Sequence, residues 1–129
     1  MIKHIIFDWQ GVLETKSGLN LELIAWIRKN KEKYQFSILT NCPGDFSEKL
    51  KKEGISDLFQ VVVNPDDFVR KPQPEAYKKL LHKAEKSSEE SLFVDDSYIN
   101  VKAAKRLGIK SILYKNNKEI FKILNSKDD

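Results

Sequence analysis

The sequence has little cysteine and little histidine, and this excludes two kinds of stabilising site. Cys42 is the only cysteine among the 129 residues, so no disulfide can form within the chain. The two histidines, His4 and His82, have no second candidate ligand nearby, and no Cys/His cluster has the spacing of a zinc site. We therefore expect a reducing compartment, and we interpret both histidines as packing or surface residues.

Long apolar runs are absent as well. The apolar residues 5–7 are followed directly by Asp8, long before the run reaches the length of a signal peptide or a membrane helix. No low-complexity tract and no linker between domains interrupts the sequence. We therefore expect a cytoplasmic protein that does not contact a membrane.

The composition that is present suits a small globular protein. A length of 129 residues with 40% hydrophobic composition predicts a single domain over residues 1–129, with a frayed polar tail at 125–129. The net charge of +4 comes mostly from lysines scattered among glutamates, a pattern typical of solvated helix faces. A nucleic-acid partner is therefore not expected, whereas acidic or phosphorylated partners are compatible with the charge.

Short apolar runs alternate with longer stretches whose apolar residues recur at helical spacing. This alternation indicates repeated βαβ units around a parallel sheet, and hence an α/β fold. The predicted strands are residues 2–8, 36–40, 59–63, 91–95 and 110–114. The predicted helices are residues 20–30, 74–86, 99–107 and 118–124, with one more that Asp45 or Ser47 caps and Gly54 ends.

Polar residues of chemical interest follow four of these segments. In open α/β sheets, ligands bind beyond the carboxyl ends of the strands, so such residues are expected to meet at one edge. Each alone has an ordinary interpretation, as a turn residue, a helix cap or a surface lysine, but their joint order favours a site. The candidates are Asp8, Thr40, Asn41, Lys71, Asp95 and Asp96.

Four sequence motifs resemble those of the haloacid dehalogenase superfamily. They are FDWQG at residues 7–11, SILTN at 37–41, RKPQP at 70–74 and FVDDS at 93–97. The resemblance covers nearly the whole chain. It implies a doubly wound, Rossmann-like sheet of five parallel strands in the order 3-2-1-4-5, and a phosphatase or related hydrolase with Asp8 as nucleophile.

The chemistry of phosphoryl transfer explains why these residue types belong together. A carboxylate can approach an anionic phosphate ester only if cations neutralise the local charge. Three carboxylates of hard oxygens suit Mg²⁺, with Asp8, Asp95 and Asp96 as ligands and the resemblance adding the backbone carbonyl of Gln10. Lys71 is then the second cation at the phosphate. Thr40 and Asn41 are the further candidates for phosphate binding.

Gln10 departs from the family pattern, in which a second aspartate serves as general acid at this position. An amide cannot exchange a proton near neutral pH, so general acid–base catalysis is expected to be lost while metal binding survives. Three interpretations stay open: a slow phosphatase for good leaving groups, a module with a persistent aspartyl-phosphate, and a catalytically silent phosphate-binding or signalling protein. The paired acids Asp95 and Asp96 favour phosphorus chemistry over halide displacement.

The loops are too short to hold a cap domain, so the resemblance is to capless members with an open site. Residues 13–19 are expected to form at most a small flap. An open site admits a phosphorylated small molecule or macromolecule, and both monomer and homo-oligomer stay open. We interpret Cys42 as a loop-packing residue rather than a nucleophile, because no paired base accompanies it. Asn100 either fixes the acidic loop by hydrogen bonds or lies on an exposed helix face.

Overall fold

A computed structural model of the chain describes residues 1–126. Its central sheet consists of β1 (His4–Phe7), β4 (Gln35–Leu39), β5 (Val61–Val63), β6 (Ser91–Asp95) and β7 (Lys110–Leu113). All neighbouring pairs are parallel and the order is β5-β4-β1-β6-β7. This is the predicted order 3-2-1-4-5, and the predicted α/β fold is confirmed.

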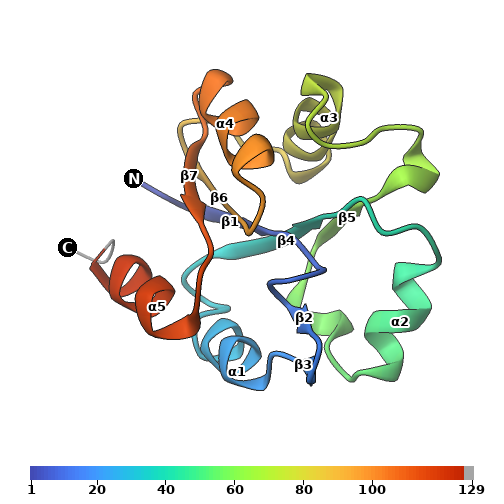
Figure 1. The fold of residues 1–129 in the computed structure, drawn as a ribbon, viewed down its shortest axis with the longest axis vertical. Helices are drawn as coiled ribbons and strands as arrows, with labels where there is room; N and C mark the ends of the chain where they lie inside the picture. The colour runs from blue at the N-terminus through green and yellow to red at the C-terminus, as the bar shows by residue number, and fades with distance from the viewer. Residues whose placement is uncertain (127–129) are drawn as a thin grey trace.

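Helices cover both faces of the sheet (Figure 1). They are α1 (Leu21–Lys29), α2 (Phe46–Lys52), α3 (Pro74–Ala84), α4 (Tyr98–Arg106) and α5 (Asn117–Ser126), with short 3₁₀ turns η1 (Ser56–Leu58) and η2 (Pro65–Asp67). Apolar residues of α1, α2 and α5 pack with Phe7, Phe36 and Ile38 in one core, while those of α3 and α4 pack with Ile6 and Phe93 in another. Because side chains alternate along a strand, adjacent residues such as Ile6 and Phe7 serve opposite layers.

Side-chain caps define where several helices begin. The Asn20 side chain accepts a hydrogen bond from the Leu23 N–H at the start of α1. At α2 the cap is Asp45, the first of the two predicted candidates, whose carboxylate accepts from the Glu48 N–H. These caps satisfy backbone donors that the first helical turn leaves free, so polar loop residues set the helix boundaries.

Several predicted boundaries differ from the structure. The third strand is only Val61–Val63, because the chain before it turns through η1. Helix α3 ends at Ala84 instead of 86, because Glu85 adopts a left-handed conformation with φ 55°. Helix α5 runs through Ser126, past the predicted end at 124, and residues 127–129 of the predicted frayed tail lie outside the described residues.

The connection from β1 to α1 holds a hairpin of β2 (Glu14–Thr15) and β3 (Gly18–Leu19), at the predicted position of the flap. Among residues 1–126 no cap domain is inserted into any connection, as predicted. No helix in this part of the chain is long and apolar enough to cross a membrane.

Candidate active site

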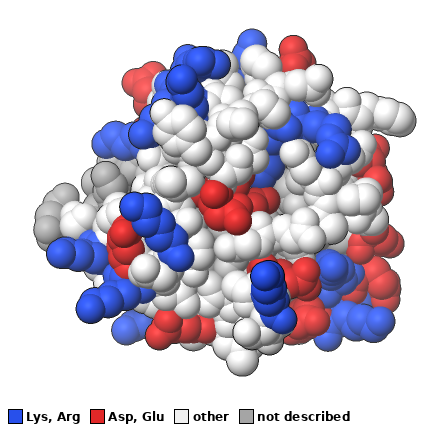
Figure 2. Space-filling view, in the orientation of Figure 1, with Lys and Arg blue, Asp and Glu red and all other residues white. Residues whose placement is uncertain are grey.

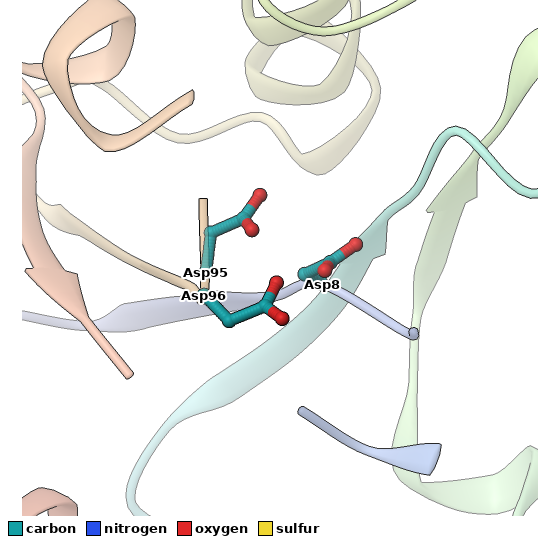
Figure 3. Close-up of side chains that lie close together, drawn as sticks. All are labelled: Asp8, Asp95 and Asp96. Carbon is teal, nitrogen blue, oxygen red and sulfur yellow. The ribbon is translucent and has the colours of Figure 1, made fainter. Parts of the chain in front are cut away.

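Three carboxylates meet at the carboxyl end of the two central strands. Asp8 directly follows β1, Asp95 ends β6, and Asp96 comes next. Strands β1 and β6 pair in parallel with Phe7 opposite Val94, so Asp8 and Asp95, which follow these two residues, lie at the same edge of the sheet. Each carboxylate offers an oxygen within 4.8 Å of the other two. Figure 3 shows the side chains of Asp8, Asp95 and Asp96 close together at this edge of the sheet.

Lys71 joins two of these carboxylates from inside the protein. Its ammonium group donates to Asp8 Oδ1 at 2.8 Å and to Asp95 Oδ2 at 2.7 Å. The Lys71 side chain is 1% exposed, and those of the two aspartates are 9% and 1% exposed. Such shielded, charge-assisted bonds are stronger than ion pairs at the surface, so the ammonium is held firmly between the two carboxylates.

Asn41 holds the Lys71 backbone in place. Its side-chain oxygen accepts from the Lys71 N–H at 2.8 Å, and its side-chain nitrogen donates to the Lys71 carbonyl at 2.9 Å. These two bonds link the segment after β4 to the segment before α3. The Asn41 side chain, a predicted phosphate ligand, is thus already engaged on both its oxygen and its nitrogen.

Thr40 lies at the end of β4 and is 1% exposed. Its hydroxyl accepts from the Cys42 N–H at 3.0 Å, which leaves the hydroxyl proton available to donate. The Cys42 thiol contacts the Pro43 carbonyl at 3.7 Å, which suits the loop-packing interpretation.

Asp95 is fixed by the loop that starts α4. Its Oδ1 accepts from the Ser97 N–H at 2.9 Å and its Oδ2 accepts from the Asn100 amide at 3.1 Å. Asn100 therefore fixes the acidic loop, which was one of the two roles open for it. The cap of α4 is Ser97, not Asp95 or Asp96, so helix capping does not account for the two adjacent acids.

Burial and like charge shift the titration of these acids. Burial raises the pKa of Asp8 to about 7, although the Lys71 ammonium lowers it, and Asp95 adds to the rise. Partial burial also raises the pKa of Asp96, together with its hydrogen bond and charge repulsion with Asp95. Three carboxylates with one bridging ammonium thus form a site that favours additional positive charge.

Gln10 and Gly11 lie on the exposed side of the carboxylates. The Gln10 side chain is exposed and lines the same cavity as Asp8. Gly11 has φ +87°, and a Cβ built on it would overlap the Asp96 carboxylate. Glycine is therefore required here both by its backbone conformation and by the close approach of Asp96.

A cavity of about 440 Å³ contains most of the predicted site residues. Every predicted site residue except Thr40 lines this cavity, and Cys42, Ser97 and Asn100 also line it. Arg70 lines the cavity too, although it was not among the predicted site residues. Its position next to Lys71 in the sequence was the one feature that could have indicated a place in the site. A larger hollow of about 580 Å³ beside α2 and β5 contains none of the predicted site residues.

A model of the haloacid dehalogenase-like hydrolase family matches residues 5–114. The chain belongs to this family. It is similar to the glyceraldehyde 3-phosphate phosphatase of Pyrococcus furiosus, with 32% identity over 95 residues, covering 71% of this chain and 40% of that protein. It also resembles the phosphoglycolate phosphatase of Vibrio cholerae, with 38% identity over 74 residues, 56% of this chain and 33% of that protein. The chain thus matches well under half the length of either relative.

The haloacid dehalogenase fold recurs in solved structures. A HAD-family enzyme from Bacteroides thetaiotaomicron, crystallised with magnesium and inorganic phosphate, superposes with a TM-score of 0.77 at 18% identity. The match covers 94% of this chain and 100% of that one. At this level of identity the likeness concerns the fold. The family assignment itself rests on the sequence match over residues 5–114.

Proposed function

We propose that this chain is a Mg²⁺-dependent phosphomonoester phosphatase that acts through an aspartyl-phosphate on Asp8 and is weakened or specialised by Gln10. The observation that carries the proposal is the cluster of three carboxylate oxygens within 4.8 Å, with the Lys71 ammonium bonded to two of the carboxylates. The phosphatase activities in the names of the two relatives support it.

The donor set fits magnesium. All three candidate side-chain ligands are carboxylates, and Mg²⁺ prefers oxygen ligands. Asp8, Asp95 and Asp96 would hold the ion, together with the Gln10 carbonyl that the family pattern suggests. When bound, the ion supplies positive charge that neutralises the carboxylates and polarises the phosphoryl oxygens.

The residues of this chain would share the chemical step as follows. An oxygen of Asp8 attacks phosphorus, forming an Asp8–phosphorus bond while the bond from phosphorus to the ester oxygen breaks. Lys71 and the Thr40 hydroxyl stabilise the phosphoryl oxygens during the transfer. Water then cleaves the aspartyl-phosphate and releases inorganic phosphate.

Gln10 limits both halves of this reaction. The departing oxygen keeps the electron pair of the broken bond and needs a proton, which an amide does not supply near neutral pH. The water that attacks the aspartyl-phosphate likewise finds no base at Gln10. We therefore propose small phosphorylated substrates whose leaving group departs readily as an anion, a narrower class than the alkyl phosphates in the names of the two relatives.

The test is Mg²⁺-dependent release of phosphate from an activated aryl phosphate. We expect slow release by the natural chain, an increase of about 10²-fold or more in Gln10→Asp, and none in Asp8→Asn. Asp66→Asn, which removes an exposed carboxylate outside the cavity, is the matched control and keeps the natural rate. Undiminished turnover in Asp8→Asn would contradict the nucleophile.

The second candidate is a catalytically silent phosphate-binding or signalling protein, and Gln10 is the observation that favours it. In that case no version of the chain releases phosphate, yet the natural chain still binds Mg²⁺ and inorganic phosphate. Trapping with a beryllium fluoride complex separates a persistent aspartyl-phosphate from simple ligand binding.

We also propose that residues 1–129 form a single domain, and that the single cysteine reflects a cytoplasmic location.

A further inference from the structure

Arg70 is a cation at the site for which the proposed chemistry has no use. It lines the cavity of about 440 Å³ together with Asp8, Asp96 and Lys71, and it is exposed. Within the described residues, no hydrogen bond, ion pair or ring contact engages the Arg70 side chain. Lys71, its neighbour, is instead bonded to two carboxylates. Of the two cations that line this cavity, Arg70 is therefore the one without a carboxylate partner in the described part of the chain.

The backbone that carries Arg70 is fixed relative to the carboxylates. Asn41 holds the next residue through two hydrogen bonds, and the Arg70 carbonyl accepts from the Gln73 N–H at 2.9 Å. Lys71 is held in the interior by its bonds to Asp8 and Asp95. The adjacent residues Arg70 and Lys71 are therefore an exposed and a buried cation. The position of Arg70 is thus set, while its guanidinium is free to meet a ligand.

The charges in the cavity indicate which ligand group it meets. A phosphate at Asp8 already has Lys71 and the Thr40 hydroxyl as donors, so Arg70 is not needed to hold it. A guanidinium presents a planar set of donors that matches a carboxylate or a phosphate in a bidentate arrangement, and beside three acidic side chains the singly charged carboxylate is repelled less than a second, doubly charged phosphate. Figure 2 shows a group of acidic side chains at the centre of this face, with Lys or Arg side chains close to it at the upper right and both kinds mixed around the edge. A second anion is therefore disfavoured at the three carboxylates and favoured beside Arg70.

We propose that Arg70 is a specificity-determining residue that pairs with a carboxylate on the substrate, so that the substrate class is a small phosphorylated carboxylic acid. The inference rests on the proposed function, because it places the phosphate at Asp8. It adds the chemical identity of the leaving group, which the metal site and Lys71 leave open.

The test compares two unreactive ligands that differ only in the carboxylate: 3-phosphonopropionate, and propylphosphonate with a methyl group instead. Binding to the natural chain is measured by calorimetry in the presence of Mg²⁺. One charge-assisted pair predicts about 10-fold to 150-fold tighter binding of the carboxylate ligand. Arg70→Gln is expected to remove this preference, and Arg70→Lys to keep part of it. Arg106→Gln, an equal loss of charge at the exposed far end of α4, keeps all of it.

Several results overturn the inference. They are equal affinity of the natural chain for the two ligands, binding of neither, a preference that survives in Arg70→Gln, and an equal loss of affinity for both ligands in that variant. The hydrolase proposal fails separately, if neither the natural chain nor Gln10→Asp releases phosphate from an aryl phosphate. A preference that depends on Arg70 would then still establish the carboxylate pairing.

Discussion

Replacing Lys71 by methionine tests how firmly the buried charges depend on one another. Lys71 donates to Asp8 at 2.8 Å and to Asp95 at 2.7 Å, and all three side chains are at most 9% exposed. Methionine fills similar space without charge, so the substitution leaves two buried carboxylates without their cation. Removal of one partner from a buried ion pair costs about 3–5 kcal/mol, and we expect a loss of about 4 kcal/mol in the free energy of unfolding.

Most of this cost is expected to fall on Asp8. Asp95 keeps two other donors, the Ser97 N–H and the Asn100 amide, whereas Lys71 is the side-chain donor to Asp8. The pKa of Asp8 is already raised to about 7, and the loss of Lys71 raises it further. A carboxyl group with a higher pKa when folded binds more protons in the folded state, so stability falls as pH rises between the unfolded and folded values. The loss in Lys71→Met is therefore larger at about pH 8 than at about pH 6.

The assay is denaturant unfolding in the presence of a metal chelator at both pH values. Lys105→Met, at an exposed position of α4, is the control and changes stability by about 0.5 kcal/mol or less. The double variant Lys71→Met/Asp8→Asn should be more stable at the higher pH than Lys71→Met alone, because it no longer has a buried Asp8 carboxylate without a cation. A loss below about 1 kcal/mol in Lys71→Met, or a double variant no more stable than the single one, would refute the reasoning.

Three further predictions concern the metal and the core. Mg²⁺ at ~100 times its Kd should raise the Tm of the natural chain by about 10 °C, measured by thermal melts with and without the ion. Asp96→Asn should remove most of this rise, whereas the control Asp66→Asn should keep it. Gly11→Ala should reduce the same Mg²⁺ response, because its methyl group overlaps Asp96, whereas Gly44→Ala, also at positive φ but in open space, should not. Burial lowers the pKa of His4 from 6.5 to about 4, so His4 by itself contributes a loss of up to about 3 kcal/mol of stability as pH falls from 6.5 towards 4, against the opposite contribution of Asp8. The stability of the natural chain minus that of His4→Gln should therefore fall over this pH range, and a difference that does not change with pH would contradict the prediction.

The positions of the strands and helices followed largely from local pattern. The segment 91–95 was predicted with both its ends, because a continuous apolar run is bounded there by polar turn residues. The end of α3 was missed by two residues, because a left-handed Glu85 has no local signature of the kind that glycine provides. The start of β5 was missed because Phe59 is apolar and buried but belongs to the turn after η1.

For the site, residue type and order predicted which residues would meet, and parallel strands made the prediction possible. The carboxyl ends of such strands share one edge, so Asp8 and Asp95 had to lie near each other once β1 and β6 were neighbours. Nothing local indicated that the Asn41 amide would hold the Lys71 backbone, because that contact joins segments 30 residues apart. The same holds for the Arg70 side chain, because only the folded structure shows that no residue between 1 and 126 pairs with it.

The amino-acid sequence by itself determined the α/β alternation, the order of the motifs and the presence of an amide at position 10, because each depends on residue type and on spacing along the chain. Only the tertiary structure decided how far apart the carboxylates lie, that Lys71 is buried between two of them, and that the Arg70 side chain has no partner among residues 1–126. The physical reason is that burial and charge pairing depend on contacts between distant segments, and these exist only after the sheet has assembled.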